Sequence, residues 1–345
     1  MTAKILVVGA TGAQGFPIVR ALVEDGRYEV TIFTRNASSA RSKTLLSLPG
    51  VTAFQGNAMN EKDIYDAFRR VDAVYCNLDG FAIGEVNETF WGIRMFEIAV
   101  ELGLKHYVWG SLDYLLKKSG YDPKYRCGHY DAKGRVAEFI LQQRPKSMVA
   151  SVLTSGPYME MLYDGMFVPR TQTDGTLLFA HPIGEGKVPM VHLDDIGRFA
   201  RWIFDHPEES NGVDLEVATE HVGWRYLVDC VQRVTGKKAV FVDLEQSVYF
   251  AKSGISATAP AAWAQAEGAP ISGGQTFWEN FSGWWSAWHD NLVTRDYAKL
   301  DRILPDRVRT LEEWMRKTHY DGSFRPILKD RSDSREASES RNVSV

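Results

Sequence analysis

Residues 126–140, RCGHYDAKGRVAEFI, contain the side chains with the clearest capacity for chemistry. Lys133 is a cation that could orient a bound cofactor, lower the pKa of a neighbouring donor or relay a proton, unless it is a solvated surface lysine. His129 precedes it by four positions, so the two share one face if the segment is helical. An imidazole there could act as acid or base near neutral pH, or only hold the local loop. Tyr130 lies about 100° further around the helix and is expected to face the interior.

A glycine-rich turn near the start of the chain, GATGAQG, indicates a dinucleotide site. It follows an apolar run typical of a buried strand and precedes an amphipathic helix. Gly9 permits the tight turn, Gly12 lets the backbone approach a pyrophosphate, and Gly15 lets the helix pack against the strand. The alternative is a plain strand-to-helix turn with incidental glycines. We expect three further loop residues to contact the cofactor at the positive end of the helix: Thr11, Ala13 and Gln14.

Polar residues after the next predicted strands extend this site. The second strand, YEVTIFTR, ends in Arg35, where many dinucleotide-binding folds have an acidic residue for the ribose 2′-hydroxyl. A guanidinium suits a 2′-phosphate, so the sequence predicts NADP(H) unless Arg35 is merely solvated. Asn57 follows the third strand and is expected to bind the adenine edge or to hold its own loop. Asn77 and Leu78 follow the fourth and are expected beside the pyrophosphate and ribose.

Strands and helices alternate over residues 1–155, and the strands are continuous apolar runs. Such strands are covered by helices on both faces, so the fold class is α/β with a Rossmann-type doubly wound parallel sheet. Residues 188–218 are expected to rejoin this domain. Residues 156–187 and 219–328 would form a smaller, mostly helical C-terminal lobe for a substrate or partner. The polar segment 329–345 is expected to be disordered.

The chain resembles the NmrA-like branch of the atypical short-chain dehydrogenase/reductases, which include isoflavone-reductase-like relatives. The resemblance rests on ILVVGATGAQG, FTRN, HYDAKGRVAEFI, TSGPYMEML and EEWMR, and extends over roughly residues 4–325. It implies an NADP(H)-binding Rossmann core with a smaller lobe, but not a single activity. Some members are redox sensors that regulate transcription factors, and others are NADPH-dependent reductases. Fungal relatives serve natural-product pathways, including steps on imine-type substrates.

The resemblance also implies roles for individual residues. In the family's reductases a lysine of this helix lies beside the nicotinamide, and Lys133 matches it. His129 stands where short-chain dehydrogenases usually carry their catalytic tyrosine, so it is a candidate proton donor. Ser111 ends the fifth predicted strand at or next to the usual catalytic serine position, or it only caps the next segment. Pro157 and Tyr158 follow the sixth strand, where the loop passes the nicotinamide carboxamide.

Candidate substrate contacts come from two regions. Tyr125 and Arg126 belong to the polar loop before the Lys133 helix and could equally be surface residues. Met159 and Met161 follow the sixth strand. In TFWENFSGWWSAWHDN, four aromatic residues repeat at helical spacing and are expected in the core: Trp278, Phe281, Trp285 and Trp288. Trp284 lies off that stripe and is expected to line a cleft for a flat or cationic substrate, or an interface with another protein.

Several function classes are disfavoured. A net charge of −4 and a pI near 6.1 argue against direct binding of nucleic acid. The three cysteines are far apart and the histidines scattered, so we predict no metal and reduced thiols. No signal peptide or membrane-length apolar run is evident, so a cytoplasmic protein is expected, or a nuclear one if it is regulatory. In HLDD, residues 192–195, Asp194 or Asp195 is expected to cap the helix that follows, in preference to a catalytic role.

The leading hypothesis is an NADPH-dependent reductase of an aromatic or imine-type small molecule in secondary metabolism. In it, Lys133 orients the cofactor, with His129 or a water as the proton donor. The second hypothesis is an NADP(H) sensor that binds a regulatory protein. The third is an NADP(H)-binding cyclase that acts on an imine without redox chemistry.

Overall fold

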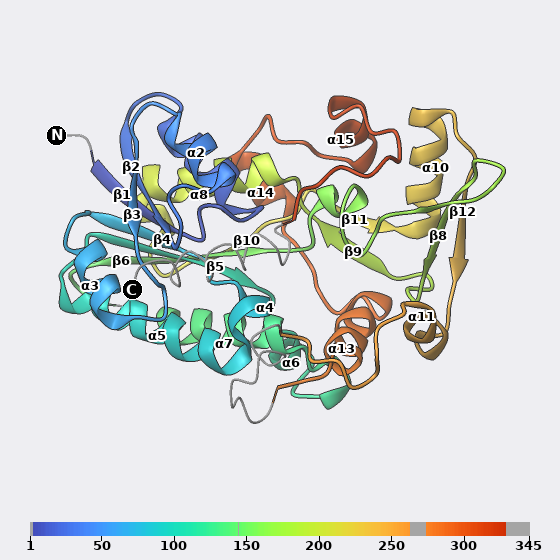
Figure 1. Cartoon of the computed structure of the whole chain (residues 1–345), viewed down its shortest axis with the longest axis horizontal. Helices are drawn as coiled ribbons and strands as arrows, with labels where there is room; N and C mark the ends of the chain where they lie inside the picture. Colours follow the sequence, from blue (N-terminus) through green and yellow to red (C-terminus); the bar gives the residue numbers. More distant parts are fainter. Residues whose placement is uncertain (1–2, 144, 263–273, 329–345) are drawn as a thin grey trace, which may run out of the picture.

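The computed structural model describes residues 3–143, 145–262 and 274–328, so the predicted tail at 329–345 lies outside the described residues. Seven parallel strands form the central sheet, in the order β3-β2-β1-β4-β5-β6-β10 (Figure 1). The chain runs outward from β1 first on one side and then on the other, so the topological switch point, where such folds bind their ligands, lies at the carboxyl ends of β1 and β4. The strands are β1 (Ala3–Val8), β2 (Tyr28–Thr34), β3 (Val51–Gln55), β4 (Ala73–Cys76), β5 (His106–Leu112), β6 (Val149–Ser155) and β10 (Asp214–Glu216).

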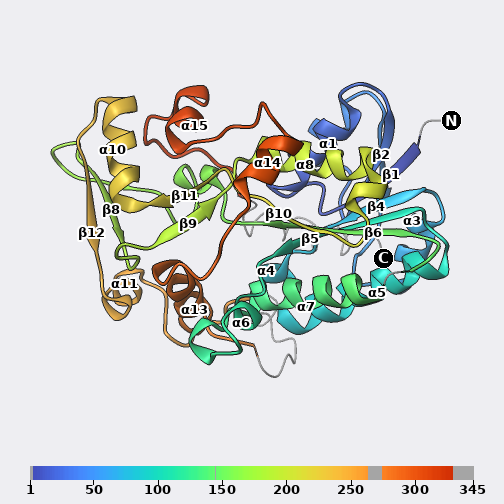
Figure 2. The same ribbon diagram turned by 180° about the vertical axis from the view of Figure 1, so that it is seen from behind.

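Helices cover both faces of this sheet (Figures 1 and 2). One face carries α1 (Gly15–Val23), α2 (Ala40–Leu46), α8 (Leu193–Asp205), α9 (Pro207–Ser210) and α14 (Tyr297–Ile303). The other carries α3 (Glu61–Phe68), α4 (Gly80–Ile83), α5 (Glu85–Glu101) and α7 (Gly128–Gln143). Helices α1 and α8 touch at Gly197, where a Cβ would lie 2.4 Å from the Pro17 carbonyl oxygen. Arg201 extends the contact by donating to the Ala21 carbonyl at 3.0 Å.

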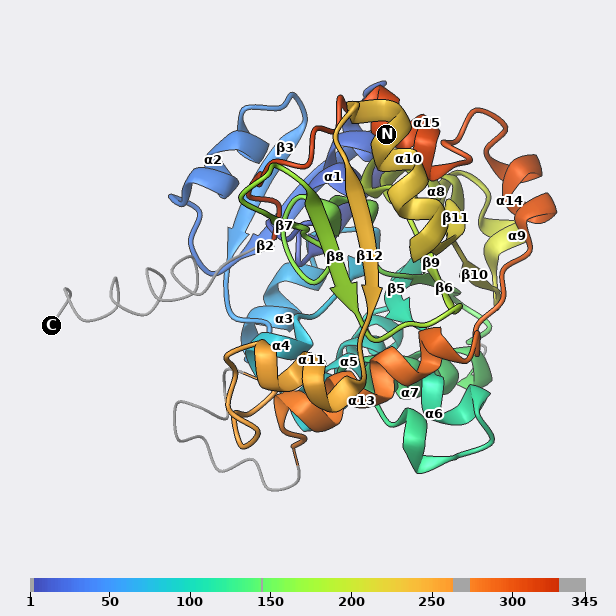
Figure 3. The same ribbon diagram turned by 90° about the vertical axis from the view of Figure 1, so that its right-hand side faces the viewer.

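A smaller lobe lies beyond the carboxyl ends of the strands. It contains a three-stranded sheet of β7 (Arg170–Thr171), β8 (Leu177–His181) and β12 (Ala239–Asp243), in which β8 and β12 run parallel (Figure 3). An antiparallel pair joins β9 (Lys187–Met190) to β11 (Glu220–Gly223). Its helices are α10 (Trp224–Thr235), α11 (Gln246–Lys252), α13 (Phe277–His289) and α15 (Leu311–Lys317). The short segments α6 (Leu115–Lys118), η1 (Pro123–Tyr125) and η2 (Met159–Leu162) link the lobe to the sheet.

The fold prediction is confirmed, with one addition: the mostly helical lobe also contains two small sheets. Its core is aromatic and continuous with the inner surface of α7, because Tyr130 packs against Trp288 with ring centroids 5.9 Å apart. Among the described helices, none has the length and apolar character that a membrane crossing requires. The Tyr130–Trp288 contact shows that the lobe packs directly against α7, next to the carboxyl ends of the strands where the candidate site lies.

Candidate functional site

The glycine-rich turn between β1 and α1 is shaped by close backbone approaches. Gly9 has φ of +82°, and a Cβ there would lie 2.3 Å from the Asn77 carbonyl oxygen. A Cβ on Gly15 would lie 2.2 Å from the Gly9 oxygen, so a side chain at either position would force the turn open. Gly12 donates its N–H to the Gly9 oxygen at 3.0 Å. Thr11 and Ala13 remain partly exposed beside it.

A chain of polar side chains joins this turn to Lys133. Asn77 donates through Nδ2 to Oε1 of Gln14, and Gln14 donates to Oγ of Ser155 at 3.4 Å. The other end of the Asn77 amide accepts from Lys133 Nζ at 2.7 Å, and Nζ also donates to the Leu78 carbonyl at 2.8 Å. The carboxyl ends of β4 and β6 are thus tied to α1 and α7, and four predicted cofactor residues lie in one network: Gln14, Asn77, Leu78 and Lys133.

Lys133 also faces a buried carboxylate. Glu88 of α5 is fully buried, and its Oε1 lies 2.8 Å from Lys133 Nζ. Burial raises the pKa of Glu88 to about 7, although the ammonium of Lys133 acts in the opposite direction. The indole of Trp109 holds the backbone beneath, donating to the Lys133 carbonyl at 3.1 Å. Lys133 is therefore largely buried, with two hydrogen bonds and one ion pair, and is not a solvated surface residue.

His129 lies on the same face of α7, as the four-residue spacing predicts. Its Nδ1 is 3.1 Å from Asn280 Oδ1 and 3.4 Å from Cys127 Sγ, and Nε2 has no partner among the described residues. The Phe81 ring centroid is 4.6 Å from the imidazole. Burial lowers the pKa of His129 to about 4. The imidazole is therefore neutral near pH 7, which makes it a hydrogen-bonding group and a weak acid.

Tyr130 and Ser111 lie on either side of this pair. Tyr130 is 2% exposed and belongs to the lobe core, in agreement with its expected inward orientation. Burial raises its pKa well above the usual range. Ser111 is buried at the end of β5, and its hydroxyl donates to the Leu112 carbonyl at 3.1 Å. The serine thus makes the local hydrogen bond expected of a strand-end hydroxyl, and its catalytic role stays a prediction.

The loop after β6 brings two more predicted residues to the carboxyl edge of the sheet. Pro157 accepts from the Val191 N–H at 2.9 Å, and the next residue pairs with Val191 as an isolated parallel bridge. That residue, Tyr158, is partly buried, and its hydroxyl makes no hydrogen bond with any described residue. Burial raises the pKa of this phenol. The Tyr158 hydroxyl is therefore available to a ligand in the loop where the sequence predicts cofactor contact.

The two residues predicted to bind the adenosine half of the cofactor, Arg35 and Asn57, differ in how far they are engaged within the protein. Arg35 follows β2, is exposed, and forms no hydrogen bond or ion pair with the described part of the chain. Asn57 accepts from the Met59 N–H at 3.0 Å through Oδ1 and donates its backbone N–H to Asp63 at 2.9 Å. The Asn57 side chain therefore holds its own loop, which is one of the two expected roles. Its Nδ2 group is left for an additional partner.

The predicted substrate contacts are mostly engaged within the protein. The Tyr125 hydroxyl donates to Asp290 at 2.8 Å, and Arg126 forms an ion pair with Glu85 at 3.1 Å. Both contacts attach the loop before α7 to its surroundings. Their role toward a substrate stays a prediction, because they would have to act in addition to these bonds.

Trp284 requires a correction. It is 2% exposed and packs with its ring 21° from that of Phe167, so the expectation that it lies off the packed face of α13 is wrong. Trp278, which the helical spacing assigned to the core, is only partly buried. The reason is that lobe residues pack against more than one face of α13, so that Trp284 is buried together with Trp285 and Trp288. Met159 is fully buried and Met161 partly exposed, so Met161 is the more accessible of the two.

A family profile described as the NmrA-like family matches residues 1–265, more than half of the chain. The chain belongs to the NmrA-like family. The predicted resemblance is thereby confirmed.

Individual relatives are more distant. An NmrA-like oxidoreductase of Cladobotryum sp., FrzB, is 28% identical over 256 residues, which cover 69% of this NmrA-like chain and 75% of the relative. The crystal structure of NmrA, a negative transcriptional regulator, in complex with NADP superposes with a TM-score of 0.72 at 17% identity, covering 92% and 95% of the two chains. The Citrobacter sp. triphenylmethane reductase with NADP(H) gives 0.68 at 15% identity, covering 92% and 100%. At such identities the structures show a shared fold.

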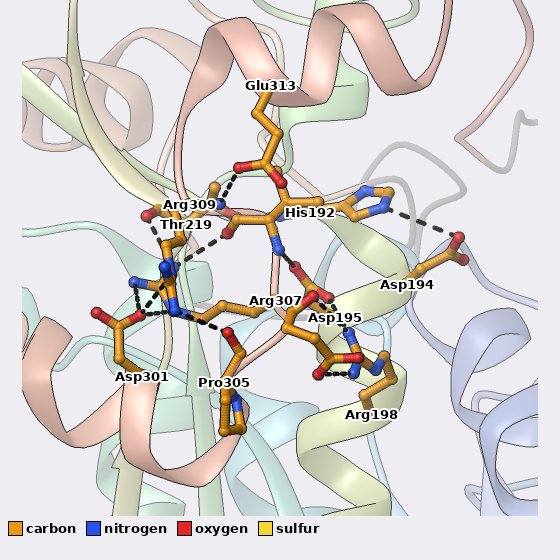
Figure 4. Close-up of polar contacts among 12 residues, drawn as sticks. His192, Asp194, Asp195, Arg198, Thr219, Asp301, Pro305, Arg307, Arg309 and Glu313 are labelled. Carbon is orange, nitrogen blue, oxygen red and sulfur yellow. Dashed lines mark hydrogen bonds and ion pairs between the residues drawn. The ribbon is translucent and has the colours of Figure 1, made fainter.

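The side chains of the HLDD segment, residues 192–195, make polar contacts at the start of α8 in this NmrA-like chain (Figure 4). The prediction that Asp194 or Asp195 caps α8 is wrong. The N-cap residue is His192, and Glu160 accepts from the Leu193 N–H at 3.3 Å. Asp195 is buried and accepts from the Val308 N–H at 2.9 Å. The carboxylate of Asp194 is 3.8 Å from His192 Nε2 and mostly exposed. The segment joins α8 to the lobe by side-chain-to-backbone bonds that local patterns cannot show.

One residue of the NmrA-like site was missed entirely by sequence reasoning. Glu88 is the only ionisable member of the buried i, i+4, i+7, i+11 face of α5, whose other members are Gly92, Met95 and Ala99. A carboxylate on such a face is the signal that could have identified it, since buried acids are rare unless they are paired. In the described ranges, no three His, Cys, Asp or Glu side chains converge as metal ligands. The three cysteines are free and buried.

Proposed function

We propose that this NmrA-like protein is an NADP(H)-binding reductase that acts on a small molecule. The observation that carries the proposal is the position of Lys133 Nζ, which is bonded to Asn77 and Leu78 at the carboxyl end of β4. This is the edge where Rossmann folds hold the nicotinamide half of their cofactor. NADPH, when bound, supplies a hydride. An ammonium held at this edge can orient the cofactor and the reacting group of a substrate.

The cradle of the glycine turn fits a dinucleotide. The positions of Gly9 and Gly15 leave no room for a Cβ, so the turn packs closely at the start of α1. The N-terminus of a helix suits a pyrophosphate, because its first backbone N–H groups lack partners within the helix. The guanidinium of Arg35 is exposed and free of described partners, which suits a 2′-phosphate. The comparisons support the choice of NADP(H), because both solved structures described above hold that cofactor. The nicotinamide half would then approach Pro157 and Tyr158.

The chemistry of His129 favours one substrate class. Since burial lowers the pKa of His129 to about 4, the residue is uncharged in neutral solution and a weak proton donor. An iminium carbon accepts hydride to give an amine without a proton, so such a substrate would not need an acid there. The ring faces of Phe81 and Phe281, 4.6 and 5.5 Å from the imidazole, could hold a flat cation. Relatives named as oxidoreductases are compatible with this reaction class.

The local space limits how a substrate could enter. His129, Phe81 and Asn280 line a cavity of about 20 Å³, which is enough for a water but too small for an aromatic substrate. Substrate binding by this route would therefore require side chains near Phe81 to move. This makes Phe81 a candidate gate, with a ring that is partly exposed before substrate binds.

The experiment incubates the protein with NADPH and a set of cyclic iminium, quinone, enone and ketone compounds. NADPH absorbance and product mass are followed together, with Lys133→Met as the matched variant. We expect NADPH loss coupled to a product two mass units heavier than a neutral acceptor, and faster turnover with iminium compounds. Product without NADPH loss would favour a non-redox cyclase. Absence of any product would contradict the enzyme proposal.

A second candidate is an NADP(H)-dependent regulator. The observation that favours it is the likeness to NmrA, which is described as a negative transcriptional regulator and was crystallised with NADP. In that case the cofactor would be bound without being consumed, and a protein partner would bind in a cofactor-dependent manner. Turnover in the assay above would count against this role as the main function.

A further inference from the structure

Three oxygen atoms lie within 2.8 Å of Lys133 Nζ, and they belong to two different parts of the fold. Asn77 Oδ1 at 2.7 Å and the Leu78 carbonyl at 2.8 Å belong to the loop that follows β4. Glu88 Oε1 at 2.8 Å belongs to α5, in the buried layer behind the loop. An ammonium has three N–H donors: Asn77 and the Leu78 carbonyl each accept from one of them, and Glu88 lies at ion-pair distance without forming a hydrogen bond. A group on a bound cofactor or substrate could replace an acceptor from the loop, whereas Glu88 would remain.

Glu88 is enclosed by residues that make its placement specific. Its side chain has no exposed area, and a Cβ on Gly80 would lie 2.3 Å from its Oε2. Lys133 is the only cation within ion-pair distance among the residues that the structure describes. A buried carboxylate without its cation would be strongly disfavoured. Glu88 therefore depends on its partner: its carboxylate, when ionised, is tolerated in this interior because the Lys133 ammonium faces it.

We propose that Glu88 is a positioning residue, which holds the Lys133 ammonium directed at the cofactor edge of the sheet. This inference rests on the proposed function, in which Lys133 faces the cofactor. Glu88 itself lies too deep to touch a ligand. It acts on Lys133, and through it on Asn77 and Gln14, whose side chains continue the same hydrogen-bonded chain. Burial of Glu88 supports the assignment. It raises the pKa of the carboxyl group, so that the ionised form depends on the nearby Lys133 ammonium.

The test is a double-variant cycle on cofactor binding. NADPH affinity is measured by energy transfer from tryptophan to the nicotinamide in four proteins: wild type, Glu88→Gln, Lys133→Met and the protein carrying both changes. We expect each single change to weaken NADPH binding by about tenfold. The double variant should bind no more weakly than Lys133→Met alone, because Glu88 acts only through the lysine. Glu97→Gln, an exposed glutamate on the same helix, is the control and should bind like wild type.

Two results would overturn the proposal: wild-type affinity in Glu88→Gln, or losses that simply add in the double variant. If Glu88→Gln does not fold, Gly80→Ala takes its place, because the new methyl group would displace the same carboxylate. That variant should also lose affinity, and unchanged binding would contradict the inference. The readout needs no turnover, so it is separate from the test of the reductase function. Unchanged NADPH binding by Lys133→Met would instead remove Lys133 from the cofactor site, whatever Glu88 does.

Discussion

His129 Nδ1 on α7 lies 3.1 Å from Asn280 Oδ1 on α13, so the lobe holds the imidazole that projects from the Rossmann domain. Cys127 Sγ, 3.4 Å from the same nitrogen, completes this setting. The direction of the Asn280 amide decides which ring nitrogen carries the proton. The lobe thus determines the hydrogen-bonding character of Nε2, the nitrogen that has no described partner.

The buried imidazole should make the protein sensitive to acid. Burial lowers the pKa of His129 from 6.5 to about 4, so the native state binds fewer protons than the unfolded state between these values. Its contribution to stability is therefore present at neutral pH and is lost as the pH falls toward 4. His129→Asn should flatten the pH dependence of the unfolding free energy in this window, measured by urea denaturation. An unchanged slope would contradict the burial argument. His106 and His181, whose pKa values are also lowered to about 4, should maintain a residual slope.

Arg35 should decide the choice between NADP(H) and NAD(H). Its guanidinium is free to pair with a 2′-phosphate, so Arg35→Asp should weaken NADPH binding by at least about tenfold while NADH binding changes little. Titration of both cofactors by fluorescence measures the two affinities. Arg20→Asp, an equal change of charge at an exposed position of α1, is the control. Equal affinities of the wild type for NADPH and NADH would refute the assignment.

The aromatic core of the lobe should depend on Trp284 more than on Trp278. Trp284 is 2% exposed and contacts Phe167, Trp285 and Trp288, whereas Trp278 is partly exposed. Trp284→Ala should lower the unfolding free energy by roughly 3–5 kcal/mol, the usual cost of truncating a buried aromatic residue. Trp278→Ala should cost clearly less. Denaturant unfolding compares them, and equal losses would show that Trp284 is not the better packed residue.

Tyr130 should matter for packing and not for turnover. Its ring lies edge-on to Trp288 in the lobe core, so Tyr130→Phe keeps that contact and removes only the hydroxyl. The rate of NADPH oxidation with an accepted substrate should stay near that of wild type, while Lys133→Met abolishes most of it. A loss of activity in Tyr130→Phe comparable to that of Lys133→Met would make the tyrosine a catalytic candidate again.

The sequence predicts what depends on local pattern and fails where distant segments meet. The alternation of apolar strands with helices predicts the correct sheet. The loops and helices that follow its strands bring Gln14, Asn77 and Lys133 together at the carboxyl edge. The four-residue spacing also places His129 on the lysine face. Glu88 and the burial of Trp284 could not be predicted, because the first depends on how α5 packs on α7 and the second on how the lobe surrounds α13.

Glu88 should give the protein a second pH dependence, opposite in sign to that of His129. Burial raises the pKa of Glu88 from 4.5 to about 7, so the native state holds more protons than the unfolded state between these values. Its contribution to stability is therefore present below pH 4.5 and is lost as the pH rises toward 7. Glu88→Gln should remove this component, so the stability of wild type relative to the variant should fall over that window. Urea denaturation of both proteins, with Glu97→Gln as control, measures the difference. A constant difference across the window would mean that Glu88 does not exchange its proton there, and that its carboxylate is stabilised by Lys133 more strongly than burial opposes it.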